Sequence, residues 1–254
     1  MSEPVRVTHA APRGQISGVE SIARALRERG DVRVLLIPSG DSSPELLQLE
    51  AAAKARGVRI WRGGPGDMRR MGRGPDAERA VALVGHSPTA SLEELLGRGG
   101  MCWLLHRAGY PSNVGFAIRT AEVSGADGVI VDAQFNHEQR GRIGHVSMGA
   151  SELLPVVYAT TEHALQLAAQ RGVRSIAIED NGALLPWQVD LRAPSVCIIG
   201  NEQTGIDGEL LARCDLSIRI PMAGFVPSYN VQAAMTAIAV ERLRQLDGSG
   251  TRQS

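Results

Sequence analysis

Two polar loops in this chain each follow a short apolar run, and such loops are where α/β proteins bind ligands. The runs 196–199 and 216–220 are brief and rich in β-branched residues, which predicts two buried strands. The loops 200–208 and 221–230 follow these runs directly. Because the carboxyl ends of strands in an α/β sheet open into a ligand crevice, we expect a binding site there. The alternative is two ordinary strand-to-helix turns.

Alternating strands and helices must position these loops. A helix is predicted over 231–246, with Asn230 as its N-cap. Upstream, strands alternate with helices, which predicts a mostly parallel sheet with helices on both faces. The predicted strands are Met101–Leu105, Gly128–Val131, Val156–Tyr158 and 175–178, and the predicted helices are 113–124 and 162–170.

A smaller α/β unit precedes this sheet. Its predicted order is helix 17–29, strand 32–37, helix 44–56, strand 58–61, an irregular glycine-rich segment 62–78 and strand 80–84. The segment before residue 16 is expected to be a loose polar stretch. We therefore predict a first domain over 1–88, a linker over 89–99, a second domain over 100–247 and a tail over 248–254.

A cluster of basic residues lies in the smaller unit. Eight basic residues against three acidic ones leave a charge of +5 between Lys54 and Arg79. Arginines among glycines suit a surface that follows RNA phosphates, and the alternative is a merely solvated loop. The basic cluster consists of Lys54, Arg56, Arg59, Arg62, Arg69, Arg70, Arg73 and Arg79.

Composition narrows the class of protein. A formal net charge of zero over 254 residues excludes a globally basic nucleic-acid binder. No apolar run approaches the roughly 18 residues of a membrane span, and the N-terminus has no signal-peptide core, so a cytoplasmic protein is expected. Cys102, Cys197 and Cys214 lie in or beside apolar runs and are expected to be buried thiols.

Missing motifs exclude several enzyme classes. The chain has no G-x-G-x-x-G after a strand and no G-x-x-x-x-G-K-[ST] loop, which argues against dinucleotide oxidoreductases and P-loop enzymes. It also lacks the G-x-S-x-G motif of α/β hydrolases. Its six histidines never fall at i, i+4 spacing, so no metal site is expected.

Three segments together resemble a known family. They are Asn113-Val-Gly-Phe-Ala-Ile-Arg119-Thr-Ala, Ile199-Gly-Asn-Glu202-Gln-Thr-Gly205, and Ile220-Pro-Met-Ala-Gly224 continuing to Ser228-Tyr-Asn230-Val. Their order and spacing resemble the SPOUT-type, SpoU/TrmH branch of RNA ribose 2′-O-methyltransferases. The resemblance covers about residues 101–246. It extends weakly over 14–84, which is similar to the ribosomal-protein-L30e-like substrate-binding domain of some members.

The resemblance implies a fold, a cofactor and partners. The expected fold is α/β, with a C-terminal parallel-sheet domain tied in a deep trefoil knot, a rare exception to the rule that chains do not thread loops. The expected cofactor is S-adenosylmethionine, and the expected partners are ribosomal or transfer RNA and a second copy of the chain bound through the catalytic domain. By motif match, the cofactor-binding residues are Ile199, Gly200, Asn201, Ile220, Met222 and Tyr229. Glycine-rich loops suit main-chain recognition because small side chains allow close approach.

Methyl transfer to a ribose hydroxyl requires alignment and help for a weak nucleophile. We expect Arg119 to clamp a neighbouring phosphate and stabilise charge developing on the ribose oxygen, because a guanidinium stays protonated. The alternative is a surface arginine paired with Glu122. Asn113 is expected to cap its helix and orient the target nucleotide, with a capping role alone as the alternative.

The remaining predicted catalytic residues come from the two loops. Glu202 is expected to hold the cofactor loop through main-chain N–H groups, either as a structural or as a catalytic residue. Ser228 and Asn230 are expected to position the substrate or the Arg119 side chain, and Asn230 is also a good N-cap.

Two departures from the family pattern leave alternatives open. Tyr229 replaces a leucine, and Tyr110-Pro-Ser stands where Asp-Pro is common. The leading hypothesis is a 2′-O-methyltransferase, acting on ribosomal more than on transfer RNA, in a housekeeping or an antibiotic-resistance role. The alternatives are a non-catalytic RNA-binding paralogue and a metabolite-binding protein that does not bind RNA.

Overall fold

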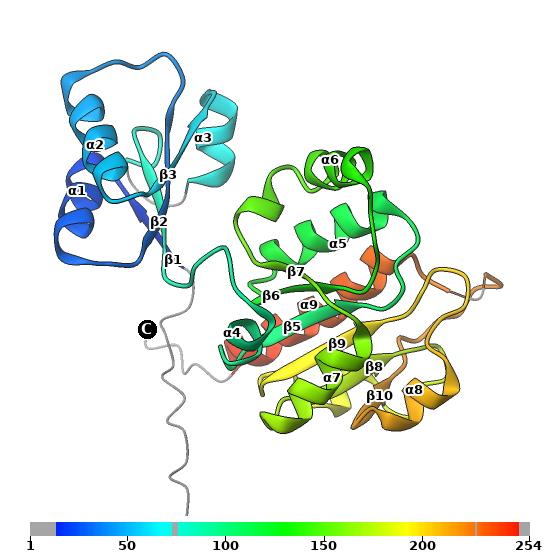
Figure 1. The fold of residues 1–254 in the computed structure, drawn as a ribbon. Coiled ribbons are helices and arrows are strands. Elements are labelled where there is room, and N and C mark those ends of the chain that lie inside the picture. The colour runs from blue at the N-terminus through cyan, green and yellow to red at the C-terminus, as the bar shows by residue number, and fades with distance from the viewer. Residues whose placement is uncertain (1–13, 73–75, 227, 249–254) are drawn as a thin grey trace, which may run out of the picture. The chain divides into compact units, whose positions relative to one another are not determined.

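The computed structural model describes residues 14–72, 76–226 and 228–248 of the chain (Figure 1). These residues form two compact units, one that ends at Pro88 and one that begins at Thr89. Arg73 of the basic cluster lies outside the described residues, as do residues 1–13 and most of the predicted tail. No helix of the described part is long and apolar enough to cross a membrane.

The first unit is a four-stranded mixed sheet with helices on both faces. Its strand order is β1-β4-β2-β3, in which β2 and β3 are parallel and the other pairs are antiparallel. Helices α1 and α2 bury Ile22, Leu26, Leu46 and Leu49 against one face, and α3 buries Met68 against the other. The elements are β1 Gly14–Ser17, α1 Val19–Glu28, β2 Val32–Pro38, α2 Pro44–Ala55, β3 Arg59–Gly63, α3 Pro65–Met71 and β4 Val81–Val84.

The structure corrects two predictions in this unit. Residues 14 and 15, predicted to be part of a loose stretch, belong to β1 because they pair with Val84 and Leu83 of β4. The segment predicted as irregular contains helix α3, which begins with Pro65 as its first residue. Asp67 accepts a hydrogen bond from the Gly64 amide and so satisfies a free donor at the helix start.

The second unit is a six-stranded parallel sheet with the order β10-β8-β9-β5-β6-β7. The predicted α/β fold with a parallel sheet is confirmed, whereas the knot remains a prediction. The elements are α4 Leu92–Leu96, β5 Met101–Leu105, α5 Pro111–Val123, β6 Gly128–Val131, α6 His137–Val146, β7 Val156–Tyr158, α7 Thr161–Gln170, β8 Arg174–Ile178, β9 Ser195–Ile199, α8 Gly208–Arg213, β10 Leu216–Ile218 and α9 Val231–Gly248, with short 3₁₀ helices at Ala150–Glu152 and Pro186–Gln188.

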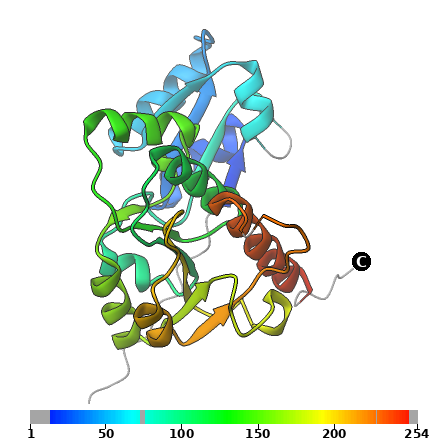
Figure 2. The ribbon, with the colours of Figure 1, turned by 90° about the vertical axis from the view of Figure 1, so that its right-hand side faces the viewer.

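Helices cover both faces of this sheet (Figures 1 and 2). On β5, Trp103 and Leu105 pack with α5, α6 and α9, while Cys102 and Leu104 pack with α4, α7 and α8. This alternation follows from the two-residue repeat of a strand, and it explains why the sequence shows a continuous apolar run here. The Cys197 thiol is also buried, and burial raises its pKa to about 12.

Residues 89–99, predicted to form a linker, are part of the second unit instead. Helix α4 lies within them, and its start is closed by a reciprocal pair in which Ser91 and Glu94 each accept the other's main-chain N–H. Leu95 is fully buried with Leu165 and Ala168 of α7. The apolar face of α4 therefore completes the core of the second unit. The glycine-rich sequence that follows α4 had suggested a linker instead.

Candidate functional site

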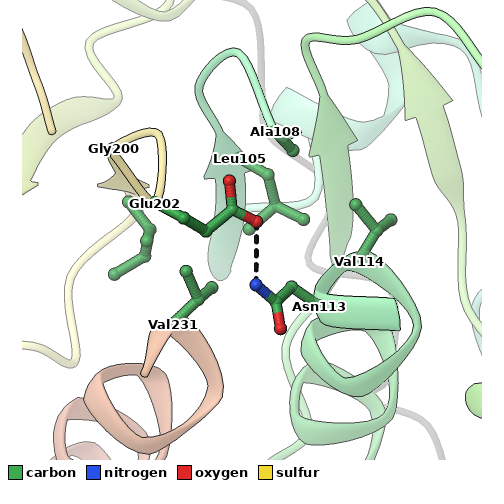
Figure 3. Close-up of a pocket in the computed structure, with 8 residues that line it drawn as sticks. Leu105, Ala108, Asn113, Val114, Gly200, Glu202 and Val231 are labelled. Atoms are coloured by element: carbon green, nitrogen blue, oxygen red, sulfur yellow. Dashed lines mark hydrogen bonds between the residues drawn. The ribbon is translucent and has the colours of Figure 1, made fainter. Parts of the chain in front are cut away.

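The site lies where the winding of the parallel sheet reverses. Strand β5 is followed along the chain by β6 and β7 on one side of it, whereas β9, β8 and β10 lie on the other side. Ligands of such sheets bind outside the carboxyl ends of the two strands that flank the reversal, here β5 and β9. A small apolar-walled pocket lies at this point (Figure 3), lined by Leu105, Ala108, Asn113, Val114, Ile199, Gly200, Glu202 and Val231.

Hydrogen bonds at this pocket join the three predicted motif segments. The Asn113 side-chain amide donates to Glu202 Oε1 at 2.9 Å, as the dashed line in Figure 3 shows. The other carboxylate oxygen of Glu202 accepts the Gly109 main-chain N–H at 3.0 Å. The Asn230 amide in turn donates to Asn113 Oδ1 at 3.4 Å. Both oxygens of Glu202 are thus occupied, which fixes its side chain.

Asn113 is not the helix cap that we predicted. Helix α5 begins at Pro111 with Tyr110 as N-cap, so Asn113 is its third residue. Proline is favoured at the first helical position because it has no N–H to satisfy, and this moves the start of the helix before Asn113. The amide of Asn113 is therefore free to reach Glu202. The cap predicted for Asn230 is confirmed: its Oδ1 accepts the Gln232 N–H at 2.9 Å.

A tight turn shapes the loop that carries Glu202. Asn201 Oδ1 accepts the main-chain N–H groups of Gln203 at 2.8 Å and Thr204 at 3.2 Å. The main chains of Asn201 and Gly205 exchange two further hydrogen bonds at 3.2 and 2.9 Å. The side-chain amide of Asn201 also donates to the Arg107 carbonyl after β5 at 2.6 Å. One asparagine thus holds the loop after β9 against the loop after β5.

Glu179 holds the far end of the same loop. It directly follows β8, and its carboxylate accepts the main-chain N–H of Ile206. A Cβ placed on Gly205 would lie 2.8 Å from Glu179 Oε1, and Gly205 has φ +65°. The loop therefore needs glycine at this position. Burial raises the pKa of the Glu179 carboxyl, and the hydrogen bond from Ile206 opposes that rise.

A larger pocket of about 450 Å³ adjoins this loop. All six residues predicted to bind the cofactor line it, together with Ser228 and Glu202. Its wall comes from the segments that follow β8, β9 and β10. The predicted cofactor residues in this wall are Ile199, Gly200, Asn201, Ile220, Met222 and Tyr229. Its volume falls within the range of about 300–1,000 Å³ that is typical of small-molecule sites.

The charge of this pocket is one-sided. Its described lining residues include the carboxylates Glu179, Asp180 and Glu202 and no arginine, lysine or histidine. Such a wall favours a cationic ligand over an anionic one. Among the described residues, no group of three or more His, Cys, Asp or Glu side chains could hold a metal ion.

Arg119 lies apart from these contacts. It is exposed on α5, and its guanidinium donates to the Met148 sulfur at 3.1 Å. It lines neither pocket, and no ion pair with Glu122 is found in the described part of the chain. The structure thus brings together Asn113, Glu202 and Asn230, places Ser228 on the larger pocket, and leaves Arg119 on the surface.

Sequence analysis missed three residues of the site. Glu179, Asp180 and Asn181 line the larger pocket but lie directly after β8, a position to which sequence analysis gave no role. The available signal was their place at the carboxyl end of a strand, the same position that singled out the loops after the last two strands.

A second polar cluster lies at the ends of β5 and β6. The buried His106 donates from Nδ1 to Thr161 Oγ1 at 2.7 Å, since that hydroxyl itself donates to Asp132 Oδ2 at 2.6 Å. Burial lowers the pKa of His106, and the neighbouring Arg107 adds to this effect, while Asp132 and Asp207 oppose it. The cluster ties the start of α7 to the two strands.

Ion pairs offset much of the basic cluster in the first unit. Lys54 and Arg62 pair with Glu50, Arg70 pairs with Asp67, and Arg79 pairs with Glu45. Arg56 donates to the main-chain carbonyls of residues 27 and 29. The +5 predicted from local sequence is therefore reduced by Glu45 and Glu50, which lie outside the counted segment.

Comparison with known proteins gives a consistent result. Residues 101–240 match the family described as the SpoU rRNA Methylase family. The chain is 31% identical over 241 residues to the 23S rRNA (guanosine-2′-O-)-methyltransferase RlmB of Pseudomonas syringae pv. tomato, covering 91% of this chain and 95% of that protein. It is 28% identical to a 23S rRNA (uridine(2479)-2′-O)-methyltransferase of Streptomyces viridochromogenes, over 91% of this chain and 82% of that protein.

A solved structure matches both units. The SpoU methyltransferase AviRb from Streptomyces viridochromogenes, in complex with the cofactor AdoMet, is 26% identical with a TM-score of 0.58. The match covers 94% of this chain and 92% of that chain. The similarity therefore extends beyond the parallel-sheet unit into the smaller one.

Proposed function

The chain belongs to the SpoU rRNA Methylase family, and we propose that it transfers a methyl group from S-adenosylmethionine to a ribose 2′-hydroxyl of ribosomal RNA. The observation that carries the proposal is the hydrogen-bonded series from Asn230 through Asn113 to Glu202. It joins one residue from each motif at the reversal of the sheet, beside a pocket suited to a cation.

The larger pocket fits S-adenosylmethionine. That molecule carries a positively charged sulfonium, and when bound it supplies the electrophilic methyl group. Glu179, Asp180 and Glu202 provide the matching negative charge. Gly200 supports the fit, because a Cβ there would lie 2.4 Å from the Gly205 carbonyl carbon, so the two stretches of main chain pack closely and leave the pocket open. We assign cofactor binding to the six predicted residues and to Glu179.

Asn113 positions the substrate. Its side-chain amide donates to Glu202 and accepts from Asn230, so the orientation of the amide is fixed before RNA binds. A group held in this way aligns a nucleotide at little entropic cost on binding. Ser228 lies on the wall of the adjoining pocket and can offer its hydroxyl to the same nucleotide.

Arg119 acts on the RNA from the protein surface. Its side chain is exposed, and the one hydrogen bond that its guanidinium donates within the described part of the chain goes to a methionine sulfur, which is a weak acceptor. Its charge is therefore available to a phosphate, which would replace that weak contact with a charge-assisted pair. We propose that it binds the phosphate next to the target ribose and stabilises the developing oxyanion.

Ribosomal RNA is the proposed substrate because relatives that match over nine-tenths of this chain are named for 23S rRNA. We propose that the smaller unit binds this RNA and that the chain works in the cytoplasm. We also propose a homodimer formed through the second unit. Exposed apolar residues on α9, namely Val240, Leu243 and Leu246, support a protein contact there.

The proposal is tested by methyl transfer from labelled S-adenosylmethionine. The substrates are ribosomal and transfer RNA, separated by size, from cells that lack the gene. We expect label in ribosomal RNA, at a linkage that resists alkali because its 2′-hydroxyl is blocked. Glu202→Ala serves as the matched inactive variant. No transfer, together with no cofactor binding by calorimetry, would refute the proposal in favour of the non-catalytic RNA-binding paralogue.

A further inference from the structure

We propose that the ring of Tyr110 stacks on an unpaired nucleobase of the RNA at the methylation site, with Gln203 holding the ring in place. The inference rests on the proposed function and names how the same site recognises its substrate. It makes Tyr110 a substrate-binding residue, distinct from the residues that hold the cofactor.

The contacts of Tyr110 place its ring beside the site. The residue directly before it, Gly109, donates its N–H to Glu202 at 3.0 Å, and Asn113 lies one helical turn after it. Its hydroxyl accepts a hydrogen bond from the Gln203 side chain at 2.9 Å. Gln203 itself lines the larger pocket. The ring therefore bridges the start of α5 and the loop after β9.

The tether fixes one end of the ring and leaves its surface open. Tyr110 is 47% exposed although its hydroxyl is bonded. A ring that is anchored at its polar tip and open on its face loses little freedom when a planar group binds to it. Single-stranded RNA is recognised mainly in this way, through bases stacked on aromatic side chains.

The helix start gives an independent reason to seek a function for Tyr110. It occupies the N-cap of α5 without a side-chain hydrogen bond to the helix. Serine, threonine, aspartate and asparagine are preferred at this position, because they accept a free N–H of the first turn. The chain thus forgoes a local stabilising interaction at a point next to the site. Such local conflicts are expected where function constrains the residue.

Aromatic residues are few in this chain, which makes their placement informative. Only nine of 254 residues are Phe, Trp or Tyr. Six rings are exposed in the described residues, and three of them, Tyr110, Phe225 and Tyr229, lie on the loops around the site, with Tyr229 lining the larger pocket. Tyr229 donates its hydroxyl to the Pro221 carbonyl within its own loop, whereas Tyr110 is tethered across two loops.

The test compares variants of Tyr110 in methyl transfer to ribosomal RNA from cells lacking the gene. Tyr110→Ala removes the ring, and we expect KM for RNA to rise about 5- to 150-fold, the range for loss of one base stack. Tyr110→Trp keeps a stacking face without the hydroxyl and should retain most of the affinity. Gln203→Ala should give an intermediate rise in KM. Trp187→Ala removes an exposed ring outside both pockets and is the matched control.

Calorimetry with S-adenosylmethionine and thermal melting accompany each variant. Cofactor affinity within about twofold of wild type shows that the site is folded, so a rise in KM then reports RNA recognition. The inference is wrong if folded Tyr110→Ala keeps the wild-type KM, or if Tyr110→Trp is impaired as much as Tyr110→Ala, since the hydroxyl would then be the functional part. If the wild-type protein methylates no ribosomal RNA, the proposed function itself fails and the inference fails with it.

Discussion

Replacing Gly205 by alanine tests how the cofactor loop is built. Gly205 has φ +65°, and a Cβ there would lie 2.8 Å from Oε1 and 3.4 Å from both Cδ and Oε2 of Glu179. The Glu179 side chain must therefore move away, and it then releases the main-chain N–H of Ile206. The substitution thus combines backbone strain with the loss of a charge-assisted hydrogen bond.

The two costs can be separated. A left-handed conformation costs an alanine about 1–2 kcal/mol. A hydrogen bond to a charged group contributes roughly 1.5–3 kcal/mol to stability. Because Glu179 is only half-buried, solvent compensates for part of this hydrogen bond, and we take its loss as about 1–2 kcal/mol. Gly205→Ala should therefore lower the free energy of unfolding by about 2–4 kcal/mol. Gly172 has φ +66° with nothing within 4 Å of its Cβ position, so Gly172→Ala should cost only about 1–2 kcal/mol.

Urea unfolding measures both variants, and calorimetry measures their affinity for S-adenosylmethionine. Gly205→Ala should also weaken cofactor binding, because the displaced carboxylate lines the pocket, whereas Gly172→Ala should leave binding unchanged. The double variant Glu179→Ala/Gly205→Ala should lose less stability than the sum of the two single variants, because removing the Glu179 carboxylate also removes its clash with the Cβ at position 205. Equal losses of stability in Gly205→Ala and Gly172→Ala would refute this account of the loop.

Three further predictions concern other parts of the molecule. Because the pKa of His106 is lowered in the folded state, the unfolded chain binds a proton first as pH falls through about 6.5, and native stability should decrease below that pH. His106→Gln should flatten this pH dependence in urea unfolding midpoints measured from pH 5 to 7.5. An unchanged pH dependence in the variant would show that other groups cause it. Arg119→Ala should lower the methyl-transfer rate by about 10²–10³-fold and leave cofactor affinity unchanged. The control Arg171→Ala removes an exposed arginine at the end of α7 and should keep the wild-type rate. A wild-type rate in Arg119→Ala would refute the role of Arg119. Replacing Arg69, Arg70 and Arg73 by alanine should weaken RNA binding. It should also reduce the slope of log K for RNA against log salt concentration by about 0.7–0.9 for each phosphate that the protein no longer neutralises. The control Arg29→Ala removes an arginine paired with Asp31 and should change neither quantity, and an unchanged slope in the triple variant would show that the basic cluster is merely solvated surface.

The second unit was largely predictable because its central strands are buried on both faces. Strands β5, β6 and β9 are continuous buried runs between breakers, and the structure confirms their positions, together with that of the half-buried edge strand β7, within a residue. Strand β10 is shorter than predicted and ends at Ile218. The Arg219 main-chain N–H donates instead to the Leu184 carbonyl, so the chain leaves the strand pairing there.

The first unit was harder because its missed elements depend on distant partners. The four residues of β1 form a strand only by pairing with β4, nearly 70 residues later. Helix α3 is hidden by glycines at 63, 64, 66 and 72, although Pro65 and Asp67 are proper helix-start signals. Gly72 is required by packing, because a Cβ there would lie 2.6 Å from that of Ala77. Composition alone therefore suggested an irregular segment.

The contacts of the site needed the strand order, which no local pattern contains. Asn113 and Glu202 lie 89 residues apart, and they meet because β5 and β9 are neighbours in the sheet. The same neighbour relation brings β8 beside β9 and so places Glu179 against Ile206. Sequence reasoning found the residues that follow β9 and β10 but passed over those after β8, because the rule for ligand crevices was applied to two strands out of three. Had it been applied to every predicted strand beside β9, Glu179 would have been a candidate from the sequence alone, whereas the tether between Tyr110 and Gln203 required atomic coordinates.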